Sequence, residues 1–423
     1  MQLRQLMVVV KSVVAGGAAL LVAGVTLVGS AYFTAKVTTL VGAALVALCV
    51  ANLGMQRALV RPQDHSTLSL AQVLNTLLLV AIFFVTFLLS ARGEPLPEMP
   101  GVQYWELSTG SRIAYLQVTP GAPVHTEPII FLHGGPGVPD MAGDAAYFGQ
   151  LSQAGYTVYV YEQVGSGRSS RLLDPRGYSV ERDAADLEEI RKEIGAERMI
   201  LIAHSYGAGI AARYIAEHGD RVARLVVTSP GSLIGGLADA GGPQSRLSTA
   251  QTIALYARLL QPRSFTTYTL LQINPRAAHN FAGDLEMDAR MEEVYRLTEP
   301  ALHCESTQAP RPLRGLGFYA NQFPQSAQAT PPQDFTASLS RFAIPTLVIK
   351  GSCDYLSWRS ALAYMDAFQK GPAHLVYLRG AGHNVYQDQP DAFKANLMAF
   401  LEDQPLPDEY TDRKTPADYE KGF

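Results

Sequence analysis

The sequence has few of the features that mark metalloproteins, redox proteins or nucleic-acid-binding proteins. Its 423 residues include only three cysteines, and these lack the close paired spacing of structural zinc sites. No H-E-x-x-H segment and no complete dinucleotide fingerprint occurs, so we expect neither a metal nor an organic cofactor. Charged residues make up only 17% of the chain, the net charge is −4 and no basic cluster is present, which argues against a nucleic-acid partner.

Charge is absent altogether from three long apolar runs near the amino terminus, residues 12–33, 37–56 and 68–90. Each run is long enough to cross the hydrocarbon core of a bilayer as a helix that rises about 1.5 Å per residue. A cleaved signal peptide is an alternative for the first run alone. We therefore expect a membrane region over residues 1–92 with three transmembrane helices, and the lipid bilayer as a partner.

The basic residues that flank these runs predict their orientation. Four of them fall on the side of the amino terminus and two on the opposite side, namely Arg4, Lys11, Arg57 and Arg61 against Lys36 and Arg92. The positive-inside rule then predicts a multi-pass protein of the cytoplasmic membrane, with its amino terminus inside and the remaining chain on the outer face.

The stretch around Ser205 carries the clearest chemical signal. An apolar run rich in β-formers, residues 199–203, leads to His204 and Ser205, and a helix of small residues follows at once. Small residues two positions before and after the serine, Ala203 and Gly207, suit a nucleophile elbow, where bulky neighbours would clash. An ordinary strand–helix junction is the alternative reading of this segment. We expect His204 to point into the packing around the elbow and not to act as a base.

A second strand runs into the glycine-rich turn at residues 133–137. Glycines there let the backbone approach a substrate closely, although a plain tight turn is the simpler alternative. We expect the backbone N–H groups of Gly135 and Tyr206 to form an oxyanion hole.

Two further strand ends carry an acid and a histidine. Asp354 follows the apolar run 344–350, and His383 follows the run 374–378 between glycines. The chain order Ser205, Asp354, His383 is the one that α/β-hydrolases use. In such a triad the imidazole takes the proton of the serine hydroxyl while the carboxylate fixes the imidazole tautomer. We expect these three residues to be catalytic.

Together these segments resemble the α/β-hydrolase superfamily and, within it, the proline-iminopeptidase-related branch. The resemblance covers roughly residues 100–403 and rests on H-G-G-P-G (133–137), Y-E-Q-V-G-S-G-R-S (161–169), A-H-S-Y-G (203–207), G-S-C-D (351–354) and G-A-G-H (380–383). That branch usually has Asp where this chain has Glu162, and a G-G-S-W-G type of elbow. The departures leave the triad intact and leave open whether the chain is an aminopeptidase or a carboxylesterase or amidase.

The resemblance implies an α/β fold with a mostly parallel sheet, helices on both faces and a helical cap over the serine. The expected organisation is a membrane region (1–92), a linker (93–101), a hydrolase core (102–230 and 336–403), a cap (231–335) and a frayed polar tail (404–423). Within it we expect a hairpin over 104–118, a helix over 178–195, cap helices over 249–260 and 286–297, and a closing helix over 389–403.

The expected function is that of a membrane-anchored serine hydrolase acting through an acyl-enzyme on a small peptide or acyl substrate. A proline-iminopeptidase-like aminopeptidase is the first choice, a carboxylesterase or amidase acting on small or lipid-like acyl compounds is the alternative, and an inactive binding module is a remote third. In the peptidase branch, cap carboxylates hold the free amino terminus of the substrate. The candidates here are Asp284, Glu286, Asp288, Glu292, Glu293, Glu299 and Glu305, and possible apolar pocket residues are Tyr295, Phe318 and Tyr319.

The two cysteines of the soluble part leave one structural question open. Cys304 and Cys353 pair if this part lies in an oxidising compartment, and two reduced buried thiols are the alternative. Because Cys353 adjoins Asp354, a disulfide would hold the segment around Cys304 at the rim of the site. The sequence leaves the oligomeric state undetermined.

Overall fold

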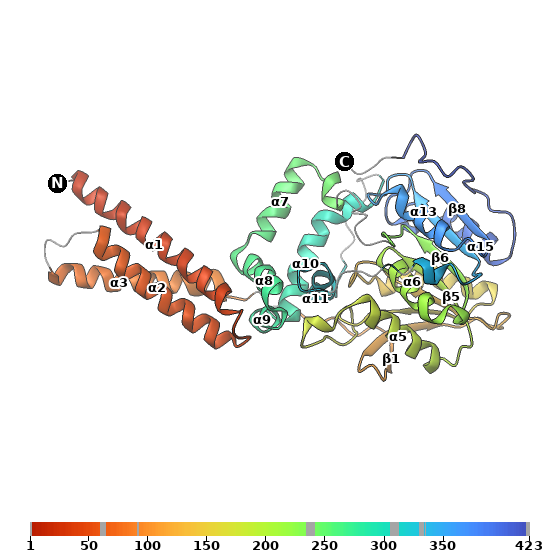
Figure 1. The fold of residues 1–423 in the computed structure, drawn as a ribbon, viewed down its shortest axis with the longest axis horizontal. Coiled ribbons are helices and arrows are strands. Elements are labelled where there is room, and N and C mark those ends of the chain that lie inside the picture. The colour runs from red at the N-terminus through yellow and green to blue at the C-terminus, as the bar shows by residue number, and fades with distance from the viewer. Residues whose placement is uncertain are drawn as a thin grey trace.

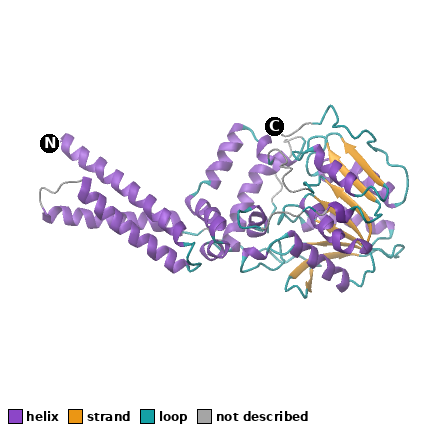
Figure 2. Cartoon of the chain, viewed as in Figure 1, coloured by secondary structure: helices purple, strands orange, loops and turns teal. Residues whose placement is uncertain are grey.

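The molecule consists of an elongated helical bundle and an α/β domain, joined end to end (Figure 1). The computed structural model describes residues 2–59, 65–90, 93–233, 242–304, 313–329, 334 and 336–419. All the strands lie in the domain, while the described part of the bundle is helical (Figure 2).

The bundle is built from α1 (Gln2–Ser30), α2 (Val37–Leu59) and α3 (His65–Phe83), and α3 continues as the short π-helix η1 (Phe84–Leu88). Ala19 and Ala23, four positions apart on α1, are buried in one cluster with Ala44 of α2. Small side chains allow two helices to approach closely. Between α2 and α3, the amide of Asn52 donates a 2.9 Å hydrogen bond to the hydroxyl of Thr76.

Two of these helices are long and apolar enough to cross a membrane, over Leu6–Ser30 and Val37–Leu59. Only 22% of the most apolar window of each is buried inside the described structure. The third predicted span, 68–90, yields only a shorter apolar helix, Gln72–Leu88, among the described residues. Length and composition thus identify two candidate spans in the described chain, where the sequence predicted three.

The domain is organised around one eight-stranded sheet with the order β1-β2-β4-β3-β5-β6-β7-β8. The first two strands form the predicted hairpin, β2 pairs antiparallel with β4, and the remaining neighbours are parallel. The strands are β1 Gln103–Glu106, β2 Arg112–Val118, β3 Ile129–Leu132, β4 Val158–Tyr161, β5 Met199–His204, β6 Val222–Thr228, β7 Thr346–Gly351 and β8 Ala373–Leu378. Strands β3, β4, β5 and β7 are buried along their whole length, as strands covered on both faces must be.

Helices cover both faces of the sheet, and the alternation along β5 shows how. Leu201 packs in one apolar cluster with α5 and α6, whereas Ile202 packs in a second cluster with α4 and α15. The predicted helix over 178–195 is α5, and the predicted closing helix is α15. The core helices are α4 Met141–Phe148, η2 Gly149–Ala154, η3 Pro175–Gly177, α5 Val180–Glu193, α6 Tyr206–His218, η4 Gly219–Arg221, α13 Trp358–Ala367, α14 Val385–Asp388 and α15 Pro390–Leu401.

A helical insertion between β6 and β7 forms the part of the domain nearest the bundle (Figure 1). The predicted helices over 249–260 and 286–297 are α7 and α10. The insertion, which we call the cap, contains η5 Pro243–Arg246, α7 Thr249–Leu259, α8 Pro262–Ile273, α9 Pro275–Phe281, α10 Asp284–Thr298, η6 Glu299–Leu302, α11 Phe318–Gln322 and η7 Phe323–Gln325, and α12 Thr336–Leu339 leads back to β7.

The polar tail after residue 403 does not fray over its described part, which corrects the sequence-based expectation. Glu409 forms an isolated antiparallel bridge with Val376 of β8, and the N–H of Tyr410 donates to the carbonyl of Leu375. The hydroxyl of Tyr419 donates to the backbone carbonyl of Asp354. Tyr410 and Tyr419 pack with one apolar cluster of the domain and Leu406 with the other, so apolar contacts hold the tail against the sheet.

Candidate active site

Ser205 lies in the sharp turn between β5 and α6, where the sequence predicts a nucleophile elbow. Its backbone angles are φ 52° and ψ −113°, a region that side-chain-bearing residues rarely adopt. The turn requires glycine at position 207, because a Cβ there would lie 2.3 Å from the carbonyl oxygen of Leu132. Ser205 N–H donates to the carbonyl of Thr228 on β6, which fixes the turn to the neighbouring strand.

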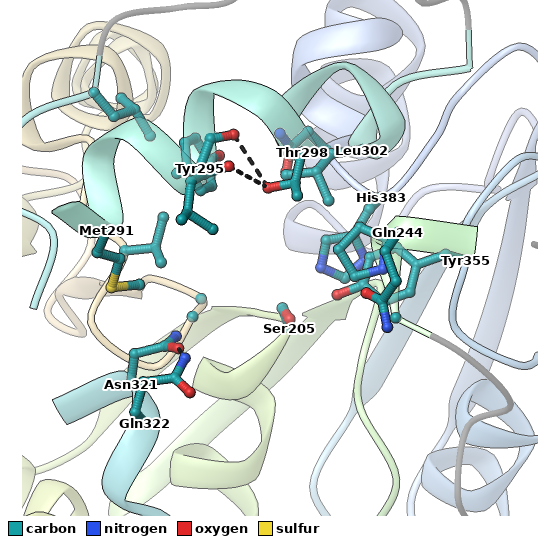
Figure 3. Close-up of a pocket in the computed structure, with 18 of the residues that line it drawn as sticks. Ser205, Gln244, Met291, Tyr295, Thr298, Leu302, Asn321, Gln322, Tyr355 and His383 are labelled. Atoms are coloured by element: carbon teal, nitrogen blue, oxygen red, sulfur yellow. Dashed lines mark hydrogen bonds between the residues drawn. The ribbon is translucent and has the colours of Figure 1, made fainter. Parts of the chain in front are cut away.

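The structure brings Asp354 and His383 into direct contact from the ends of β7 and β8. His383 Nδ1 lies 2.9 Å from Asp354 Oδ1, and both side chains are buried. Because Nδ1 faces the carboxylate, Nε2 is the nitrogen left to accept a proton from a hydroxyl. His383 and Ser205 line the same cavity (Figure 3).

Lys350 forms an ion pair with the other oxygen of Asp354, a feature that was missed at the sequence level. Its Nζ lies 2.6 Å from Asp354 Oδ2, and both side chains are fully buried. Burial alone would raise the pKa of Asp354, but the Lys350 ammonium and then His383 outweigh it and hold that pKa well below its usual range. Asp354 is therefore a carboxylate at every physiological pH.

Two aromatic rings hold the imidazole of His383 in place. The ring centroids of Tyr355 and His204 lie 4.6 and 4.9 Å from that of His383. His204 is buried, as expected, and also reaches the cavity wall. Burial and the nearby His383 lower the pKa of His204 to about 3, so it stays neutral.

The turn at residues 133–137 approaches the serine as predicted. A Cβ on Gly134 would lie 3.0 Å from Ser205 Cβ, and one on Gly135, whose φ is 121°, would lie 2.7 Å from two backbone nitrogens. Both glycines line the cavity. Tyr206 is the first residue of α6, so its N–H is one that a helix leaves without an intrahelical acceptor. Gly135 and Tyr206 are therefore the chain neighbours of Gly134 and Ser205, and their role as oxyanion donors stays a prediction.

The histidine of this turn, His133, contacts backbone groups of its neighbours. His133 Nε2 accepts from the N–H of Gln163, and Nδ1 lies 2.8 Å from the carbonyl of Gly134. Burial lowers the pKa of His133 to about 4.

Glu162, the departure from the family pattern, is buried and accepts hydrogen bonds from the backbone N–H and the side chain of Arg168. Burial raises its pKa although Arg168 opposes that shift.

The segment at the end of η6 contacts the loop of Asp354 and the loop of His383. The sequence predicted only a contact with the first of these loops. The carbonyl of Leu302 accepts from His383 N–H at 2.7 Å, and Asp388 accepts from the N–H groups of Gly382 and Cys304. Cys304 and Cys353 form a disulfide, so the first of the two alternatives holds. The segment around Cys304 is therefore fixed to the loop of Asp354 as well as to that of His383.

A cavity of about 720 Å³ lies between the cap and the carboxyl edge of the sheet. Ser205 lies at its floor, and α10, with Met291 and Tyr295, lies above it (Figure 3). Most of the cap side chains that line it are apolar, among them Leu255, Leu259 and Tyr268. Of the three predicted pocket residues, Tyr295 lines the cavity, whereas Phe318 and Tyr319 are buried in the apolar core of the cap.

The carboxylates that the sequence offered for an amino terminus lie elsewhere. None of the six candidates in the described part of the cap lines the cavity, and Glu305 falls outside the described residues. Each of the six has another partner: Asp284 contacts His279, Glu286 contacts Arg263, Asp288 contacts Arg171, Glu292 contacts Gly315, Glu293 contacts Arg258 and Glu299 contacts His303. The carboxylates at the cavity wall are Asp140 and Asp144 of the core.

The site offers acid–base groups but no metal-binding cluster. Among the described residues, no group of three or more His, Cys, Asp or Glu side chains is placed to hold a metal ion. A hydroxyl on a strained turn and an imidazole oriented by a carboxylate are the groups that can activate attack on a carbonyl carbon.

Comparison with known families agrees with this geometry. The family model described as "alpha/beta hydrolase fold" matches residues 127–390, which hold all the triad positions and the whole cap. This chain belongs to the α/β-hydrolase family. The match begins after the helical bundle and after the β1–β2 hairpin.

Individual α/β-hydrolase relatives have varied activities. Epoxide hydrolase A of Mycobacterium tuberculosis is 26% identical over 316 residues, which cover 67% of this chain and 91% of that protein. A proline iminopeptidase of Levilactobacillus brevis is 27% identical over 288 residues, covering 65% and 88%. The human 1-acylglycerol-3-phosphate O-acyltransferase ABHD5 is 27% identical over 300 residues, covering 69% and 82%. At such identities the family indicates a hydrolase, and the substrate has to be argued from the cavity.

Proposed function

We propose that this chain is a membrane-anchored serine hydrolase that cleaves esters or amides with an apolar acyl group through an acyl-enzyme. The observation that carries the proposal is the strained Ser205 at the floor of a cavity that is also lined by His383, whose imidazole contacts the buried Asp354. Strain of this kind persists only where the surrounding structure imposes it, and it is frequent at catalytic positions.

In the proposed reaction, Ser205 Oγ attacks the acyl carbonyl carbon while His383 Nε2 takes the hydroxyl proton. The N–H groups of Gly135 and Tyr206 donate to the oxyanion. His383 then gives the proton to the leaving alcohol or amine as its bond to the acyl carbon breaks. In the second half, His383 takes a proton from a water that attacks the same carbon, the bond to Ser205 Oγ breaks, and His383 returns the proton to Oγ. Asp354 stays ionised throughout and stabilises the imidazolium.

The composition of the cavity wall favours the esterase or amidase over the aminopeptidase. An aminopeptidase must bind a charged ammonium, which calls for a carboxylate facing the substrate. The described cap carboxylates are engaged with other groups, whereas Leu255, Leu259 and Met291 present apolar surface. The aminopeptidase remains the second candidate because Asp140 and Asp144 reach the cavity from the core, and because relatives include proline iminopeptidases.

We also propose that α1, α2 and the continuous α3–η1 helix cross the membrane, with the hydrolase domain on the outer face. The amino terminus lies at the end of the bundle far from the domain (Figure 1), as three crossings require. The polar Asn52–Thr76 contact lies between helices rather than on the outer surface of the bundle, which suits a lipid environment. The Cys304–Cys353 disulfide suits an oxidising compartment.

The test compares three aryl substrates with the full-length protein in detergent: a proline arylamide with a free amine, the same amide N-blocked, and a medium-chain aryl ester. Ser205→Ala is the control for background hydrolysis. We expect cleavage of the ester and indifference to the amine. Cleavage of the free-amine amide alone would instead establish the aminopeptidase, and equal rates for wild type and Ser205→Ala would refute the serine mechanism.

A further inference from the structure

The cap has an apolar surface patch at the corner between α7 and α8. Ile253, Tyr256, Leu260 and Phe265 are 65%, 51%, 62% and 55% exposed, and we call these four residues the cap patch. Ile253, Tyr256 and Leu260 are spaced by three and four positions, so they share one face of α7 and its last turn. Large apolar side chains gathered on one face mark a surface that binds another apolar surface.

The cap patch lies next to the point where the bundle meets the domain. Arg263, two residues before Phe265, donates a 2.9 Å hydrogen bond to the carbonyl of Phe87 in η1. Farther along the cap, Asn274 donates to the carbonyl of Ala31 and Asn280 to that of Ala35. These contacts fix α8 and α9 to the ends of all three helices of the bundle, so the cap lies at the level where the bundle leaves the bilayer.

The direction of α7 and the loop beside it agree with this placement. In Figure 1 the axis of α7 runs across the direction of α1, as a helix lying along a membrane surface would. Tyr32 and Phe33, in the loop between α1 and α2, are 72% and 91% exposed at the same end of the bundle. Exposed aromatic rings at the end of a membrane helix are typical of the interface between lipid and water.

The cap patch is continuous with the cavity over Ser205. Tyr256, Leu260 and Phe265 are exposed and also line the cavity, and Leu255, Leu259 and Tyr268 are further apolar residues of the cavity wall. An acyl chain can thus pass from the surface to the serine along apolar side chains. The cap patch and the cavity wall thus share Tyr256, Leu260 and Phe265.

We propose that the cap patch is immersed in the outer surface of the bilayer and admits acyl lipids from the membrane directly to Ser205. The substrate class is then an ester or amide of a long acyl chain that resides in the bilayer, rather than a water-soluble one. This inference rests on the proposed function for its chemistry. The continuity of the patch with the anchored end of the bundle favours lipid as the occupant over a second protein.

The first test measures contact with lipid and needs no enzymatic activity. Full-length Ile253→Trp and Val124→Trp are reconstituted in phosphatidylcholine vesicles with or without bromine on the acyl chains, which quenches tryptophan on contact. Val124 is also highly exposed, at 73%. It precedes the amino end of β3, whereas the cap lies at the carboxyl ends of the strands. The native Trp105 and Trp358 are buried and give both variants the same background. We expect quenching of Ile253→Trp only, and equal quenching of the two would overturn the proposal.

The second test measures entry of substrate. Wild type, Ile253→Glu and the matched control Val124→Glu are assayed on a long-chain umbelliferyl ester dissolved in the vesicles and on a water-soluble butyrate ester. Ile253 does not line the cavity, so hydrolysis of the butyrate should be unchanged in both variants. Ile253→Glu removes one apolar side chain from contact with lipid. We therefore expect the rate of hydrolysis of the vesicle ester to fall roughly tenfold for Ile253→Glu and not for Val124→Glu.

The outcomes separate the two proposals. Quenching of Ile253→Trp together with failure to cleave either ester would refute the proposed hydrolase function and leave the membrane contact standing. Cleavage of both esters with no quenching, or with Ile253→Glu as active on vesicles as Val124→Glu, would keep the hydrolase and overturn lipid entry. In that case the patch would be assigned to a protein partner.

Discussion

Replacing Lys350 by methionine should both destabilise the protein and slow its reaction. The Nζ–Oδ2 distance to Asp354 is 2.6 Å, and the side chains of both residues are 0% exposed. Removal of one partner of a buried pair costs about 3–5 kcal/mol because the other charge stays buried. Asp354 keeps His383 and the N–H of Leu356 as partners, so we expect the lower end of this range, about 3 kcal/mol.

A double-mutant cycle isolates this pair. Asp354→Asn alone leaves the Lys350 ammonium buried without its counter-charge, whereas Lys350→Met with Asp354→Asn removes both charges. We therefore expect the double variant to be more stable than the sum of the single effects predicts, by more than about 1 kcal/mol. Denaturant unfolding of the detergent-solubilised protein, followed by near-ultraviolet circular dichroism of the domain, measures all four proteins.

The pH dependence gives a second check on the same pair. The pKa of Asp354 is held below its ordinary value of 3.8, so the stability from its ionised form is present above that pH and is lost as the pH falls below it. The difference between wild type and Lys350→Met should therefore narrow below about pH 4. Additive single effects, each under about 1 kcal/mol and independent of pH, would refute the account of Lys350.

Three further predictions concern the turn at Ser205, the Cys304–Cys353 disulfide and His303. Ser205→Gly and Ser205→Ala should both be inactive, but the glycine variant should be more stable by about 1 kcal/mol because φ of 52° strains alanine; equal melting temperatures would contradict this. Cys304→Ser opens a disulfide with a sequence separation of 49 and should cost up to about 4 kcal/mol under oxidising conditions, whereas Cys49→Ser, a free cysteine, should cost little in denaturant unfolding. The pKa of His303 is raised to about 9 because Asp388 and Glu299 outweigh the effect of its burial. Its contribution to stability is therefore complete below pH 6.5 and is lost as the pH rises through 9, so the melting temperature of wild type should fall between pH 7 and 10. His303→Gln should make that fall smaller, and parallel melting curves for the two proteins would contradict the prediction.

The sequence predicted those features that depend on local backbone chemistry. The elbow at Ser205, the glycine turn and the acid and histidine at strand ends each show in a few neighbouring residues, because strand, turn and helix signals are local. Parallel strands bring their carboxyl ends to one edge, so the order of the motifs was enough to predict the meeting of Asp354 and His383.

The features that the sequence did not predict depend on partners far along the chain. Glu286 and Asp144 are both acidic residues on helices, so the sequence does not distinguish their positions. In the structure Glu286 pairs with Arg263, whereas Asp144 lines the cavity. The carbonyl of Leu302 meets His383 only once the cap has folded over the sheet. The tail was expected to fray because it is polar, yet Tyr419 reaches the loop of Asp354.

The most direct test of the serine mechanism is covalent labelling of the full-length protein with a fluorophosphonate, followed by peptide mass spectrometry. Nucleophilic attack by an activated serine predicts a single adduct on Ser205, formed rapidly in wild type and much more slowly in Asp354→Asn. Ser205→Ala should remain unlabelled under the same conditions. An adduct on another residue, or equal labelling of wild type and Ser205→Ala, would contradict the account.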